Sequence, residues 1–163
     1  MDAPIAFCAV IEAGGPSFMP MHLLVVPHAA WLALGGPATK RVLATFNGSL
    51  PERLGLLPQE GGGRCLLLRK VLRQRLALQA GQEVAVTLAP DPDPTHVELP
   101  EELAEALAAW PEAEAAFARH SGAMRRAMAR KVADAKRPDT RARYAVELAE
   151  RLARGGHPFR GAA

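Results

Sequence analysis

The sequence predicts an α+β protein, with β-strands concentrated in its first half and helices in its second. Short apolar runs such as HLLVV, RVLATF and EVAVTL occur before residue 98 and are bounded by glycine, proline or asparagine, as strands between turns usually are. From Pro100 onward the apolar residues recur instead at the three- and four-residue spacing of helices. With 49% hydrophobic but only 5% aromatic residues, the chain suits alanine- and leucine-rich helices beside a small β-core.

The strands of the first half favour a compact barrel or sandwich, because they are short and closely spaced. In EVAVTLAP, the side chains of Val84, Val86 and Leu88 alternate with others and should share one buried face. Residues 69–80 (RKVLRQRLALQA) have a helical spacing of apolar residues that ends at Gly81. We therefore expect one helix embedded among the strands.

The proline-rich loop APDPDPTH, residues 89–96, is predicted to be the boundary between the two halves. Asp91 and Asp93 each precede a proline, which favours extended geometry. These carboxylates and His96 could hold a metal ion, but the loop lacks the tight glycine turn of hard-ion sites, so we interpret it as a solvated linker. The expected organisation is a β-domain at 1–98, a helical region at 99–156 and a flexible tail at 157–163.

About four helices are expected in the second half. Pro100 and Pro111 suit the first positions of two helices. A third helix ends near Ala135, because Pro138 cannot continue its hydrogen-bond ladder. The fourth begins at Asp139, a natural N-cap, or one residue later. The buried stripe of the third helix is predicted to be Met124, Met128 and Val132.

Charge is distributed unevenly along the chain, although the net charge is only +3. Residues 101–114 carry five acids and no base, whereas residues 119–143, which we call the basic segment, carry nine bases and two acids. This segment can pair with the acidic helix of the same chain, meet phosphates, or remain solvated, and a basic isoelectric point does not decide among these. The sequence leaves all three interpretations open.

No constellation of residues predicts a defined reaction. The three serines lie in no GxSxG elbow, and the five histidines show no HxxxH or HExxH spacing, so we predict no catalytic residue, metal ligand or cofactor. Cys8 and Cys65 have no CxxC partner and are expected to be buried, reduced thiols. The N-terminus lacks the basic region of a secretory signal, and the longest apolar stretch is interrupted by polar residues and glycines. We therefore expect a cytoplasmic protein without a membrane span.

The run from RVLATFNGSLPERL to EVAVTLAPD, followed by LPEELAEAL, AEAAF, TRAR and LARG, resembles a known bacterial family. Its members join a domain of unknown function numbered 1905 to a YdeI/OmpD-associated, or bacteriocin-protection, helical segment, and the resemblance covers about residues 5–155. It implies a small β-barrel of the double-split type, related in shape to AbrB and MazE barrels, followed by a helical cap. The family has no established reaction, so the resemblance assigns no catalytic residue.

Together these observations predict a non-enzymatic binding or stress- and antimicrobial-tolerance protein, a monomer or homodimer, which recognises a small anionic ligand or a protein partner between barrel and cap. The break at Pro138 should place cations around a helix N-terminus, where free N–H groups and the helix dipole favour an anion. The residues of this candidate site are Lys136, Arg137, Thr140 and Arg141. A second candidate set, at the start of the embedded helix, is Arg69, Lys70 and Arg73.

Two other functions remain open. The first is a nucleic-acid-binding module that uses the face of residues 125–143 for phosphate contacts. Such contacts release counterions, so the affinity of this module would fall steeply with salt. Its contact residues would be Arg125, Arg126, Arg130, Lys131 and Arg143. The second is a small hydrolase or transferase in the cleft between barrel and cap, with His28, His96 or His120 beside a carboxylate.

Overall fold

The computed structural model describes residues 3–15, 17, 20–59 and 61–161. The chain splits into two compact units, Met1–Pro94 and Thr95–Ala163, which we call the β unit and the helical unit. Nearly all described strands and helices follow the predicted division, because strands β1 to β8 lie in the first unit and helices α3 to α6 in the second. The α+β class is therefore confirmed.

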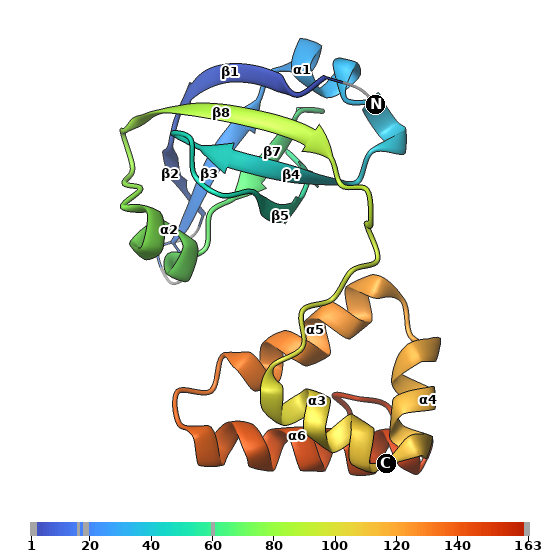
Figure 1. Ribbon diagram of the computed structural model, residues 1–163. Coiled ribbons are helices and arrows are strands. Elements are labelled where there is room, and N and C mark those ends of the chain that lie inside the picture. Colours follow the sequence, from blue (N-terminus) through green and yellow to red (C-terminus); the bar gives the residue numbers. More distant parts are fainter. Residues whose placement is uncertain (1–2, 16, 18–19, 60, 162–163) are drawn as a thin grey trace. The chain divides into compact units, whose positions relative to one another are not determined.

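The first sheet of the β unit is antiparallel and has strand β8 near its centre, as Figure 1 shows. Its order is β1 (Ile5–Val10), β8 (Glu83–Pro90), β4 (Arg41–Phe46) and β5 (Glu52–Gly55). Strand β8 forms because its β-branched and leucine side chains alternate: Val84, Val86 and Leu88 are at most 1% exposed. The predicted buried face of EVAVTLAP is confirmed.

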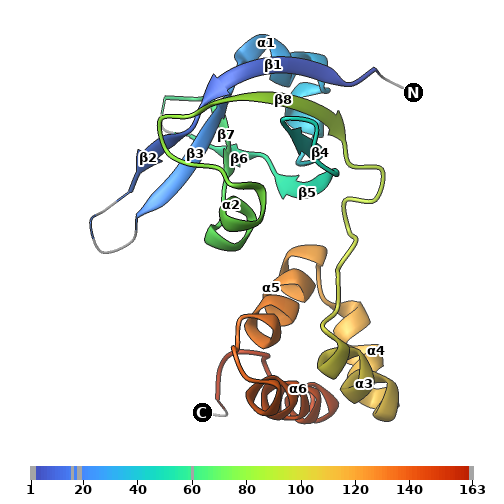
Figure 2. The ribbon, with the colours of Figure 1, turned by 60° about the vertical axis from the view of Figure 1, so that its left-hand side comes forward.

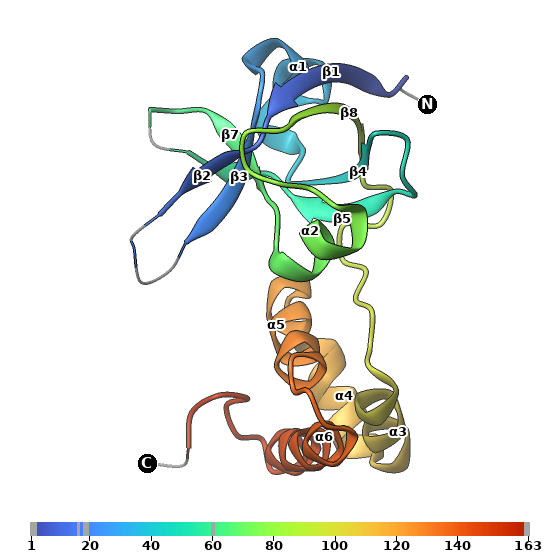
Figure 3. The same cartoon turned by 90° about the vertical axis from the view of Figure 1, so that its left-hand side faces the viewer.

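The second sheet is also antiparallel, and its β2–β3 hairpin extends away from the other strands in Figure 3. Its order is β2 (Glu12–Gly14), β3 (Met21–Val26), β7 (Arg64–Leu67) and β6 (Leu57–Pro58). Leu24 and Leu66 are opposite each other in the β3–β7 register, and both are fully buried. The inner faces of both sheets contribute to one hydrophobic core.

The expected closure into a single barrel is not observed among the described residues, because the strand pairings form two separate four-stranded sheets. The sheets are instead joined by chain that passes directly from one to the other. Ile11 alone separates β1 from β2, and Leu56 alone separates β5 from β6. Both residues are buried, at 1% and 6% exposure, so the chain turns each corner inside the core.

The β unit contains more helix than the single embedded helix that we predicted. Helix α2 (Lys70–Leu76) matches that prediction but ends earlier, since Ala77 adopts the left-handed conformation with φ of 53°. Leu78 lies in the turn that follows the helix, and its side chain is buried. A second short helix, α1 (His28–Ala33), and a 3-10 turn, η1 (Gly36–Ala38), lie in the apolar stretch between β3 and β4. Pro27 is the N-cap residue of α1. We had interpreted this part of the sequence only as an apolar stretch that polar residues and glycines interrupt.

The helical unit consists, in its described part, of the four predicted helices around a second core (Figure 2). Their bounds are α3 (Glu101–Ala109), α4 (Pro111–Arg119), α5 (Gly122–Ala133) and α6 (Pro138–Ala153). Helix α6 contacts each of the other three. Of the predicted stripe of α5, Met128 and Val132 are fully buried, and Met124 packs against this core. None of the described helices is long and apolar enough to cross a lipid bilayer.

Proline and serine determine where the later helices begin. The Ser121 hydroxyl accepts a hydrogen bond from the Met124 N–H at 3.2 Å and caps α5. Pro138 occupies the first position of α6, so Arg137 is the N-cap residue. The prediction of Asp139 as N-cap was therefore wrong. We had used Pro138 only as a stop signal, whereas its fixed φ also suits the first turn of a helix.

Candidate functional site

The basic segment begins at Arg119, the last residue of α4, and extends over α5, the connection to α6 and the first turns of α6. The acidic stretch 101–114 forms α3 and the start of α4, which both pack against α6. The internal-pairing interpretation can therefore be tested directly, because acids and bases of one unit lie on neighbouring helices.

Arg141 pairs with the acidic helix. Its Nε donates to Glu102 Oε1 at 2.8 Å, and its Nη1 donates to the carbonyl oxygens of Ala135 and Lys136, both at 3.2 Å. The hydrogen bond from Arg141 lowers the pKa of the Glu102 carboxyl from its ordinary value of 4.5, and a bond from its own backbone N–H adds to this. Arg141 thus links α3, the end of α5 and α6, which leaves little of its guanidinium for a ligand.

The other three residues of this candidate site remain around the N-terminus of α6. Lys136 and Arg137 are exposed and form no ion pair within the described part of the chain. Thr140 is half-buried in the first turn of α6, and no side chain caps this helix. The structure therefore places Lys136, Arg137 and Thr140 together, while Arg141 is engaged by Glu102 beside them.

The second candidate set lies in the β unit at the start of α2. Arg69 is the N-cap residue and is exposed, as is Lys70, the first residue of the helix. The Arg73 side chain turns back, and its Nε donates to the Leu68 carbonyl oxygen at 3.1 Å. Arg73 therefore helps to hold the junction between β7 and α2, and α2 itself has only seven residues.

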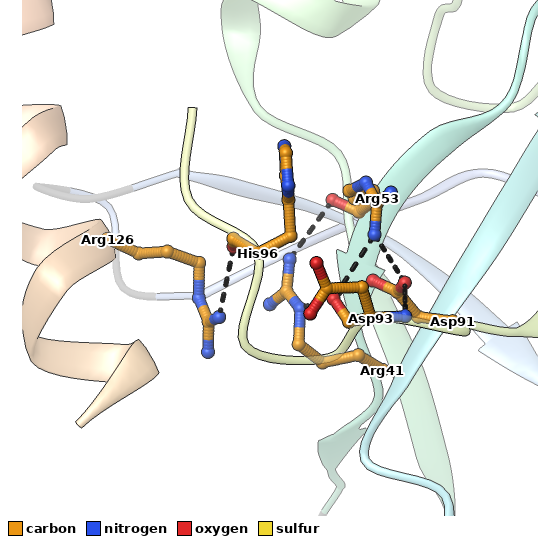
Figure 4. A network of polar contacts seen from close by, with 6 residues as sticks. All are labelled: Arg41, Arg53, Asp91, Asp93, His96 and Arg126. Carbon is orange, nitrogen blue, oxygen red and sulfur yellow. Dashed lines mark hydrogen bonds and ion pairs between the residues drawn. The ribbon is translucent and has the colours of Figure 1, made fainter. Parts of the chain in front are cut away.

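The five residues of the predicted nucleic-acid face do not have equal access to solvent. Arg125 and Arg126 are half-buried, and Arg126 Nη1 donates to the His96 carbonyl oxygen at 3.5 Å (Figure 4). Arg130, Lys131 and Arg143 are exposed. The accessible part of this predicted face is therefore reduced to three cations.

Two of these exposed cations lie against the only tyrosine of the sequence. Lys131 Nζ is 5.3 Å from the centroid of the Tyr144 ring, and Arg143 Cζ is 5.6 Å from it. Both distances are within the range of cation–π contacts, each worth about 0.5–1 kcal/mol at exposed sites. The aromatic ring thus holds one cation from α5 and one from α6.

The β unit contains a polar network that the sequence did not reveal. The Asp91 carboxylate, whose side chain is 0% exposed, forms ion pairs with Arg41 and Arg53 (Figure 4). Its Oδ1 accepts hydrogen bonds from Arg53 Nη1 and from the Asp93 backbone N–H, the latter at 2.9 Å. Arg53 Nη1 also donates to the Asp93 carbonyl oxygen at 3.2 Å. These contacts fix the chain where it leaves β8.

The interpretation of this loop as a solvated linker was wrong for Asp91. The two arginines are far from it in sequence and approach it only because β4 pairs with both β5 and β8. A possible signal was the position of Asp91 directly after the buried strand β8, where a carboxylate needs a partner. Strand register, which selects Arg41 and Arg53 as those partners, is not encoded in a short motif.

The histidines and cysteines of the described chain form no evident chemical centre. The His28 and Trp31 rings have centroids 5.4 Å apart and are tilted by 53°, and His120 is the C-cap residue of α4. No group of three or more histidine, cysteine or acidic residues is placed to hold a metal ion within the described residues. Cys65 is buried, and burial raises the pKa of its thiol. Cys8 is exposed on β1, so the expectation that both thiols are buried was wrong.

Comparison with protein families identifies both halves of the chain. A family model described as domain of unknown function (DUF1905) matches residues 7–88, and one described as bacteriocin-protection, YdeI or OmpD-associated matches residues 96–155. The two matches occur in the predicted order, which confirms the resemblance drawn from the sequence. A search of curated proteins finds no match to this chain. The chain therefore belongs to the DUF1905 family and carries, after that domain, a YdeI/OmpD-associated helical region.

Proposed function

We propose that this protein is a non-enzymatic binding protein whose helical unit recognises an anionic ligand or partner. The observation that carries the proposal is the exposed charge of Lys136 and Arg137. Both precede the uncapped N-terminus of α6, and neither forms an ion pair in the described chain. Two adjacent cations and free N–H groups attract oxyanions more strongly than either does alone.

The pairing of Arg141 with Glu102 reduces the candidate anion site to Lys136, Arg137 and Thr140. Internal pairing was the main competing interpretation of the basic segment, and Arg141 supplies an example of it. The same contact holds the α5–α6 connection through two carbonyl oxygens, so the backbone beside Lys136 is positioned before any anion binds. Preorganisation of this kind reduces the entropy that binding would otherwise cost.

The family supports a role in tolerance rather than in catalysis. The family model that matches residues 96–155 carries the description bacteriocin-protection, YdeI or OmpD-associated. The basic segment lies within this region. We propose that the protein acts in stress or antimicrobial tolerance in the cytoplasm, by binding an anionic molecule or partner.

A double variant tests the site. Lys136→Met with Arg137→Met should weaken binding of inorganic tripolyphosphate by about tenfold, if each cation contributes about 0.7 kcal/mol, as measured by isothermal titration calorimetry. The matched control is Arg119→Met with Arg160→Met, which removes the same charge from exposed positions of the same unit. Equal weakening by both double variants would indicate a general charge effect and would overturn the assignment to the α6 N-terminus.

Nucleic acid is the second candidate partner, favoured by the exposure of Arg130, Lys131 and Arg143. If these three cations contact phosphates, affinity for a single-stranded oligonucleotide should fall about 20-fold between 50 and 200 mM salt. Fluorescence anisotropy measures this slope directly. Affinity that stays constant over this range would exclude the three residues as a phosphate-binding surface.

A further inference from the structure

A small pocket opens in the helical unit, apart from the α6 N-terminus. Its volume is about 90 Å³, and its polar lining consists of Lys131, Tyr144, Glu147 and Arg151. Val132, Leu148 and Pro158 supply the apolar part of the lining. Tyr144, Glu147 and Arg151 are spaced by three and four residues on α6, so they share one face of that helix.

Pro158, in the chain that follows α6, forms part of the lining of this pocket. Arg151 Nη1 donates to the Pro158 carbonyl oxygen at 3.2 Å, and Pro158 is buried. The His157 Nδ1 accepts hydrogen bonds from the N–H groups of Phe159 and Arg160, at 3.1 and 3.2 Å. This turn is therefore held in place by hydrogen bonds within the chain.

Size and charge limit what the pocket can hold. The pocket is smaller than a cavity of about 150 Å³ that holds a benzene ring, so it suits a polar group of a few heavy atoms rather than an aromatic ring. Lys131 and Arg151 contribute two positive charges, and Glu147 contributes one negative charge. The lining therefore carries a net charge of +1, and Arg143, whose Cζ lies 5.6 Å from the Tyr144 ring, adds to a positive field that attracts small anions.

We propose that this pocket binds the carboxylate group of a small organic acid. Lys131 and Arg151 supply the charge, and the Tyr144 hydroxyl is available as a hydrogen-bond donor. Glu147 can accept a hydrogen bond from an ammonium group next to the carboxylate. The site contains neither Lys136 nor Arg137, so it is independent of the proposed anion site, although it shares Lys131 with the candidate nucleic-acid surface.

The single tyrosine makes the pocket directly observable. Protein labelled with ring-¹³C tyrosine gives NMR signals from Tyr144 alone, which can be followed during titration with sodium acetate, glycine and inorganic phosphate. Sodium chloride at equal ionic strength provides the reference. We expect acetate and glycine to shift these signals with Kd of about 1–10 mM, as suits ligands of four or five heavy atoms. Phosphate tests whether the pocket selects a carboxylate over another small anion.

Two variants separate the pocket from its surroundings. Lys131→Met should raise the Kd for acetate about tenfold, whereas Arg130→Met, at the neighbouring exposed position outside the pocket, should change it less than twofold. Glu147→Gln should strengthen phosphate binding, because it removes the repelling charge. Thermal unfolding of each variant confirms that the helical unit remains folded.

The outcomes are decisive in both directions. Absence of any shift of the Tyr144 signals beyond that caused by chloride would overturn the proposal, as would tighter binding of phosphate than of acetate. Equal effects of the Lys131 and Arg130 variants would also overturn it. The Lys136→Met, Arg137→Met protein should retain acetate binding, so failure of the pocket and failure of the proposed function would be observed separately.

Discussion

Asp91 should be the most sensitive polar residue of the β unit. Asp91→Ala removes a carboxylate whose side chain is 0% exposed and leaves Arg41 and Arg53 without it. Breaking a buried ion pair costs about 3–5 kcal/mol. The two arginine side chains are 18% and 31% exposed, so water recovers part of this cost. We therefore expect a loss of about 2–4 kcal/mol in the free energy of unfolding.

The two tryptophans allow this loss to be assigned to one unit. Trp31 lies in the β unit and Trp110 in the helical unit, so a Trp110→Phe background reports on the β unit alone. In urea unfolding with an m value of about 2 kcal/mol/M, the midpoint of the Trp31 transition should fall by about 1–2 M. In a Trp31→Phe background, the Trp110 transition should remain unchanged, because the described ion-pair partners of Asp91 belong to the β unit.

Asp91→Asn provides the matched control. Its amide oxygen can still accept from the Asp93 N–H, but its charge is lost, so the expected cost is about half that of the alanine variant. A change of less than about 0.5 kcal/mol in the β-unit unfolding energy of Asp91→Ala would refute the reasoning, since that is the range of ordinary surface substitutions.

Three further predictions concern Glu102, the two cysteines and Ala77. Because the folded-state pKa of Glu102 is lowered, its stabilisation should be complete above its unfolded pKa and lost as pH falls through the folded value; Arg141→Met should reduce, but not remove, this contribution to the acid dependence of urea unfolding between about pH 6 and pH 3, since the bond from the Glu102 backbone N–H remains. An aromatic disulfide reagent should react with Cys8 in the native protein but with Cys65 only after unfolding, so Cys8→Ser should remove the fast phase; a fast phase that persists would contradict the burial of Cys65. Ala77→Gly should raise thermal stability by about 0.5–1 kcal/mol, because alanine is strained at φ of 53°, and a decrease would show that this strain is negligible.

Local patterns predicted the elements well where a helix or strand depends on its own residues. Val84, Val86 and Leu88 fix the buried face of β8 by alternation alone, and Pro111 fixes the start of α4 by its restricted φ. The end of α2 could not be predicted in this way. Leu78 continues the helical spacing, but it reaches the core from a left-handed turn at Ala77, which few alanines adopt.

The candidate site was harder to predict, because it depends on which charges meet in space. The sequence identified the acidic helix as a possible pairing partner of the basic segment. Only the packing of α3 on α6 selects Glu102 as the partner of Arg141. The Tyr144 pocket depends on Pro158, which we assigned to a tail. A hydrogen bond from Arg151 to a backbone carbonyl oxygen holds that residue, and such bonds have no signature in side-chain patterns.

The corner residues Ile11 and Leu56 have a consequence for how the β unit folds. Each lies in a continuous stretch of chain whose two ends belong to different sheets, so one sheet cannot dissociate without pulling strands from the other. Partial unfolding of a single sheet should therefore be suppressed, and backbone amides of β8 and β7 should exchange with deuterium at similar, globally limited rates. The β unit is thus expected to fold as one cooperative element, slowly, because its pairings join distant residues such as Phe7 and Val86.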